Sequence, residues 1–155
     1  MKLKPFSNHF LHLLILIAAI TISSACNKDD DNPGNIVQFS ATLDQAQETP
    51  PTGVSATGSC TATYDTATNQ LTYTLTWTGL TGAPTAMHFH KADIGVPGDV
   101  EIPINGFPTT TSGTFSSSAT VDQNDENDLL ENKFYVNIHT AAYPAGEIRG
   151  QLIKQ

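Results

Sequence analysis

The stretch from Thr57 to Thr78 reads TGSCTATYDTATNQLTYTLTWT and consists of two alternating runs joined by a short polar segment. Apolar side chains occupy every second position in both runs, and the positions between them are mostly threonine. Successive side chains of a strand point to opposite faces of its sheet, so this period of two predicts one buried and one exposed side. With a turn at 66–70, the stretch predicts an antiparallel β-hairpin.

The same period extends outward from this hairpin in both directions. Further strands are predicted at about 36–43, 85–91, 100–104, 111–121, 134–140 and 147–153. Only 125–132 suggests a helical turn, and no window of ten residues has the helical period. About seven or eight short antiparallel strands predict an all-β domain, an immunoglobulin-like or Greek-key β-sandwich or barrel.

The first 25 residues have the composition of a signal peptide. Lys2 and Lys4 precede an apolar run that ends at Ile22, and small residues then lead to Cys26. This arrangement resembles a bacterial lipoprotein signal, which implies cleavage before Cys26, acylation of its thiol and attachment to a membrane. The alternative is an ordinary secretory signal followed by an incidental cysteine.

Residues 26–35 are predicted to form a flexible acidic tether, because their polar, charged, Pro- and Gly-containing sequence cannot build a core. A Lys-Asp-Asp run at this position resembles the export signals of surface lipoproteins in some Gram-negative bacteria. The resemblance implies a lipid anchor in the outer membrane with the domain at the cell surface. A plain solvated spacer is the alternative, which leaves a periplasmic or an outward orientation open. The β domain is expected at 36–155.

Net charge and cysteine content limit the possible partners and the possible disulfide bonds. The chain carries 7 basic and 15 acidic residues, and without Lys2 and Lys4 the mature part would have a net charge of −10. Such a charge argues against nucleic acid as a partner and is compatible with cations. If Cys26 is acylated, Cys60 has no disulfide partner; its apolar phase predicts a buried, inert thiol.

A set of motifs spread from about Phe39 to Gln151 resembles the CHRD domain, a module named after chordin and found in many secreted bacterial proteins. The motifs are Gln47–Pro51, Ala56–Gly58, Leu71–Tyr73, Gly79–Gly82, Ala86–His90, Tyr135–Thr140 and Tyr143–Gln151. The resemblance implies an immunoglobulin-like β-sandwich or barrel. It implies little about activity, because a shared fold is a poor guide to function.

Three histidines remain once the signal peptide is removed, and all lie in these motifs. His88 and His90 occupy alternate positions of one predicted strand, so they share a face, while Met87 and Phe89 take the other. If the strand that carries His139 lies close by, three imidazoles converge into a set suited to copper or zinc. Copper is favoured because Cu(II) heads the affinity order for nitrogen ligands. The alternative is three structural histidines bonded to backbone or carboxylates.

Other polar residues are candidates for supporting roles. Glu48 is a candidate additional metal ligand, and it is equally a candidate for a structural ion pair with Arg149. Asn137 and Asp93 are candidates to orient an imidazole from outside the ligand set.

Three functions are therefore compatible with the sequence. The first is an exported, lipid-anchored domain that binds copper or zinc through His88, His90 and His139. The second is a metal-free extracellular module that binds a protein or glycan. The third is a metal-dependent, oxidase-like enzyme, for which the sequence names no catalytic residue.

Overall fold

The computed structural model describes residues 1–2 and 35–155. The predicted signal peptide, the Cys26 acylation site and nearly all of the predicted tether lie outside the described residues. Within the described part, no helix combines the length and the apolar character needed to cross a membrane.

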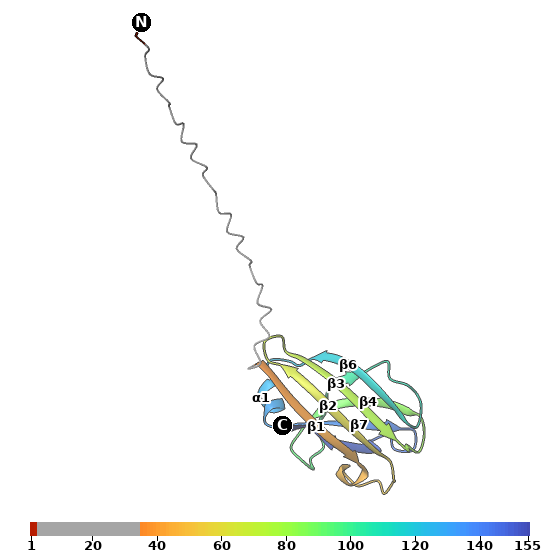
Figure 1. Ribbon diagram of the computed structural model, residues 1–155. Coiled ribbons are helices and arrows are strands. Elements are labelled where there is room, and N and C mark those ends of the chain that lie inside the picture. The colour runs from red at the N-terminus through yellow and green to blue at the C-terminus, as the bar shows by residue number, and fades with distance from the viewer. Residues whose placement is uncertain (3–34) are drawn as a thin grey trace. The chain divides into compact units, whose positions relative to one another are not determined.

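The described domain is all-β, as the sequence predicts, and its strands form a single antiparallel sheet that curls into a nearly closed barrel (Figure 1). The strands are β1 (Ile36–Asp44), β2 (Thr57–Asp65), β3 (Gln70–Thr78), β4 (Pro84–Lys91), β5 (Asp99–Ile104), β6 (Gly113–Thr120), β7 (Phe134–Thr140), β8 (Ile148–Gln151) and β9 (Ile153–Lys154). A 3-10 helix at Gln45–Gln47 and the short helix α1 (Glu126–Leu130) complete the domain. The strand order is β5-β4-β7-β8-β1-β2-β3-β6, and β9 pairs with β1.

The alternating hairpin is confirmed at the predicted residues. β2 and β3 pair over their whole length, and the apolar side chains Cys60, Tyr64, Leu75 and Trp77 are buried. The threonines between them face outward. The β4 prediction is also confirmed, because Met87 and Phe89 are fully buried in the core. Met87 is thereby separated from the histidines on the other face.

β7 and β8 depart from the alternating pattern, because all of their residues are buried on both faces of the sheet. One face packs on the barrel core. The segment 92–98, which joins β4 to β5, covers the other face through backbone contacts. Gly98 N–H donates to the Tyr135 hydroxyl (3.1 Å), and the Gln151 side-chain amide donates to the Ala92 carbonyl (3.0 Å). Polar side chains are thus buried on the outside of the barrel.

Candidate metal centre

The pairing of β4 with β7 brings the three predicted histidines together. Ala86 lies opposite His139, and His88 lies opposite Asn137. Residues paired across two strands point to the same face of the sheet, and so do residues two apart along one strand. His88, His90 and His139 therefore all project from the outer side of the barrel. The sequence predicts that the three imidazoles converge only if the two strands lie close together, and in the structure they do.

Backbone carbonyls orient two of the imidazoles in the same way. His139 Nδ1 lies 3.1 Å from the Pro144 carbonyl oxygen, and His90 Nδ1 lies 3.0 Å from that of Gly98. A carbonyl only accepts, so each Nδ1 carries the proton and donates it. A neutral imidazole has one ring proton, which leaves the lone pair of each ring on Nε2. This is the arrangement in which a histidine binds metal through Nε2 with its other nitrogen fixed by an outer partner.

The remaining contacts of the rings lie within the cluster. His88 Nδ1 is 3.0 Å from His139 Nε2, and His90 Nε2 is 3.0 Å from Asn137 Oδ1. A neutral His90 that donates through Nδ1 requires the Asn137 amide to be flipped, so that its N–H donates to His90 Nε2. Asn137 therefore does contact an imidazole, as expected of an orienting residue, but at the nitrogen that a metal would use. The Asn137 amide has to turn away before His90 Nε2 can bind a metal.

The nitrogen geometry fits one small ion after a minor adjustment. One ligand atom from each of the three histidines can be chosen so that all lie within 4.8 Å of one another. Bonds of about 2.0–2.1 Å to a single metal require nitrogen separations of about 4.2 Å or less, so the nitrogens have to approach by up to about 0.6 Å. None of the described carboxylates or thiols joins the group, so Glu48 is not placed as a fourth ligand.

Burial favours the neutral, metal-binding form of His88 and His139. The pKa of His139 is lowered to about 4, mainly by burial and also by the neighbouring imidazoles of His88 and His90, against the opposing effect of the Pro144 carbonyl. Burial and the nearby His90 also lower the pKa of His88. Metal ligation requires neutral imidazole, so protons compete poorly for His139 at neutral pH. His88 is only half-buried and forms the solvent-facing side of the cluster.

Tyr135 connects the cluster to Arg149. Its ring stacks on the imidazole of His90, with centroids 4.8 Å apart and planes 4° from parallel. The guanidinium carbon of Arg149 lies 3.4 Å from the centroid of the same ring. Because β4 and β8 flank β7 on opposite sides, the tyrosine lies between the two groups. A cation over an aromatic face is favourable when it is desolvated, so this contact helps to hold Arg149 in place.

Glu48 and Arg149 are both buried near each other, but no direct ion pair joins them. Burial raises the pKa of Glu48 to about 7, while Arg149 and the backbone of Thr49 act in the opposite direction. Glu48 Oε1 has no hydrogen-bond partner. It packs against Gly146, at the position that a Cβ atom would occupy if this residue were not glycine. Asp93 meets Arg149 through its backbone carbonyl, and its side chain makes no hydrogen bond to an imidazole among the described residues.

The unpaired state of Glu48 predicts a pH-dependent stability. The folded protein keeps the Glu48 proton up to about pH 7, whereas an unfolded chain releases it near pH 4.5. The contribution of Glu48 to stability is therefore most favourable below pH 4.5 and is lost as the pH rises through 7. Glu48→Gln is expected to raise the free energy of unfolding at pH 8 by about 2 kcal/mol, less than the full shift implies because solvent screens part of the carboxylate. At pH 4 the variant and the native protein should unfold at the same urea concentration. An equal effect at both pH values would contradict the assignment.

Glu147 is a buried carboxylate whose role the sequence did not reveal. It precedes β8, is fully buried, and accepts hydrogen bonds from the Thr81 backbone N–H (2.7 Å), the Thr81 hydroxyl (2.7 Å) and the Thr140 hydroxyl (2.6 Å). These bonds join the β3–β4 connection to the end of β7. The Glu-Ile-Arg-Gly motif could have indicated a structural carboxylate, but its partners are distant in sequence.

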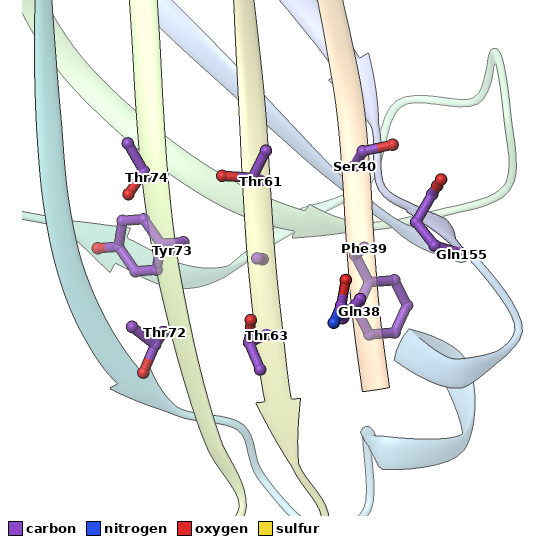
Figure 2. A pocket seen from close by; sticks show the side chains of 10 residues that line it. Gln38, Phe39, Ser40, Thr61, Thr63, Thr72, Tyr73, Thr74 and Gln155 are labelled. Atoms are coloured by element: carbon purple, nitrogen blue, oxygen red, sulfur yellow. The ribbon is translucent and has the colours of Figure 1, made fainter. Parts of the chain in front are cut away.

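Two other features are separate from the cluster. A hollow of about 320 Å³ lies outside β1, β2 and β3, where Thr61, Thr63, Thr72 and Thr74 project from the sheet (Figure 2). None of its described lining residues supplies an imidazole, carboxylate or thiol. Cys60 is buried, and burial raises the pKa of its thiol to about 12, so it is inert as predicted.

The fold and the site define a class of all-β domain, a nearly closed antiparallel barrel with a buried polar face that carries a three-histidine cluster. The chain belongs to the CHRD domain family, whose model matches residues 39–152. The resemblance seen in the sequence motifs is therefore confirmed over most of the chain. Searches of curated proteins and of solved structures each gave no match.

Proposed function

We propose that this domain binds one transition-metal ion through His88, His90 and His139. The observation that carries the proposal is the convergence of three ring nitrogens within 4.8 Å. It is supported by the two Nδ1–H···O=C contacts, which put the ligand lone pairs of His90 and His139 on Nε2; His90 Nε2 becomes available once the Asn137 amide turns away. Backbone carbonyls and the Asn137 amide orient His139 and His90, but no carboxylate among the described residues joins the three imidazoles.

Copper is the ion that this donor set favours. Three neutral nitrogens suit both copper and zinc, and Cu(II) lies above Zn(II) in the affinity order for such ligands. His88 faces solvent, so the ion would keep an open position for water or another small ligand. The same domain, anchored by an acylated Cys26 at the surface of a Gram-negative outer membrane, would hold the ion outside the cell. Storage, delivery and redox chemistry all remain compatible with this site.

Metal titration of the tag-free protein tests the proposal. Cu(II) is expected to bind with one equivalent per chain, and its electron spin resonance spectrum should show hyperfine coupling to nitrogen from several imidazoles. Zn(II) should compete for the same equivalent. Failure to retain either ion after gel filtration would reject the metal function and leave the metal-free binding module as the remaining hypothesis.

A further inference from the structure

A second polar pocket lies beside Arg149, and its two charged groups lack the partners that such groups normally have. Arg149 is 2% exposed and Glu48 is 8% exposed, and both line a pocket of about 380 Å³. Buried charges are ordinarily paired, because each loses its hydration on burial. Here no direct ion pair forms, so both groups have unused capacity for a ligand.

Arg149 has unused hydrogen-bonding capacity. Its Nη2 makes two long contacts, to the Asp93 carbonyl (3.5 Å) and to Gln151 Oε1 (3.4 Å). Among the described residues, Nε and Nη1 have no protein acceptor, and neither counts as a fully buried unsatisfied atom. Arg149 lines the pocket, so its N–H groups without a protein acceptor are available to a ligand there. At the end of the guanidinium, one Nη1–H lies parallel to one Nη2–H, and this pair matches the two oxygens of a carboxylate, which can replace the long Nη2 contacts by shorter ones.

Glu48 complements such a ligand when it is protonated. Its carboxyl group holds a proton more strongly than usual, and the neutral acid donates a hydrogen bond. A negative ligand on Arg149 would further favour that neutral form. The rest of the wall includes the apolar side chains of Ala46, Pro51 and Ile94. The pocket thus offers a fork of donors, one acid proton and a small apolar surface.

We propose that this pocket binds a small carboxylate with a short aliphatic tail, held by the guanidinium edge of Arg149 and the carboxyl group of Glu48. The carboxylate lies against Arg149, and the tail lies toward Ile94 at the rim. The site does not require the metal, because none of the three histidines lines the pocket.

Nuclear magnetic resonance of the metal-free protein gives a direct test, because Arg149 is the only arginine in the chain and its Nε–H signal needs no assignment by mutation. Sodium butyrate is expected to shift this signal in a saturable way, with a dissociation constant on the order of 1 mM for so small a ligand. Butyramide has the same shape without the charge and should produce no saturable shift. Absence of saturation with butyrate, or an equal response to butyramide, would overturn the proposal.

Two exposed positions on the covering segment provide a matched pair of variants. Ile94 lines the pocket and Val96 does not, while both side chains are exposed, so neither substitution disturbs the core. Ile94→Asp places a negative charge at the rim and should weaken butyrate binding roughly fivefold, whereas Val96→Asp should leave it unchanged. Glu48→Gln keeps a donor and should retain binding. Native affinity in Ile94→Asp, or loss of binding in Glu48→Gln, would contradict the site. His139→Ala should bind butyrate normally, which separates this test from that of the metal centre.

Discussion

Replacing His139 by alanine is expected to lower the affinity for Cu(II) by at least about a hundredfold. Loss of an outer partner of a metal ligand typically costs 10–100-fold, and removal of one of three ligands should cost more. His139 contributes the Nε2 atom that lies 3.0 Å from His88 Nδ1, so its loss leaves a pair of imidazoles on one strand. Competition with a chromophoric chelator measures the affinity, and spin resonance should show fewer coupled nitrogens.

Two further variants separate ligand loss from damage to the fold. His139→Asn preserves an N–H that can donate to the Pro144 carbonyl but removes the ligand nitrogen, so it should lose copper as His139→Ala does. Asp93→Asn changes a titratable side chain that makes no hydrogen bond to the imidazoles in the described structure, and it should bind copper normally. Retention of native affinity by His139→Asn would show that the ion is held elsewhere.

Glu147→Leu is expected to lower the free energy of unfolding by about 4 kcal/mol. The substitution leaves the Thr81 N–H and two hydroxyl groups without their acceptor, and hydrogen bonds to a charged group are among the strongest in proteins. This loss is a large part of the stability of a typical domain. Urea unfolding can be followed by the fluorescence of Trp77, the only tryptophan, which is fully buried.

Glu147→Gln should be much milder, with a loss of about 1 kcal/mol, because its oxygen still accepts from Thr81 N–H and the hydroxyls can accept from its amide. Glu131→Gln is the matched surface control. Glu131 pairs with Lys133 at 2.8 Å in an exposed setting, so its replacement should change stability by less than about 1 kcal/mol. If Glu147→Leu cost no more than the surface control, the three contacts would have no net stabilising role.

The all-β fold could be predicted from the sequence because the alternation of apolar and polar side chains along a strand is a local property. Alternation in 57–65 and 71–77 determines which side chains face the core, and the structure pairs these segments as the predicted antiparallel hairpin. The same rule assigned His88 and His90 to one face and Met87 to the other. The alternation rule was less successful at 147–153, where the single predicted strand is divided into β8 and β9 around the buried Leu152.

The sequence alone determined an all-β chain, a CHRD resemblance and three candidate ligands. Only the tertiary structure decided that β7 lies beside β4, that Asn137 occupies the His90 nitrogen, and that Glu48 and Arg149 are buried without pairing directly. The physical reason is that side-chain periodicity is encoded locally, residue by residue. Strand order and the covering of one face by a loop instead depend on contacts between segments far apart in the chain. These contacts decide both which polar side chains lose their water and which of them find a hydrogen-bonding or ionic partner.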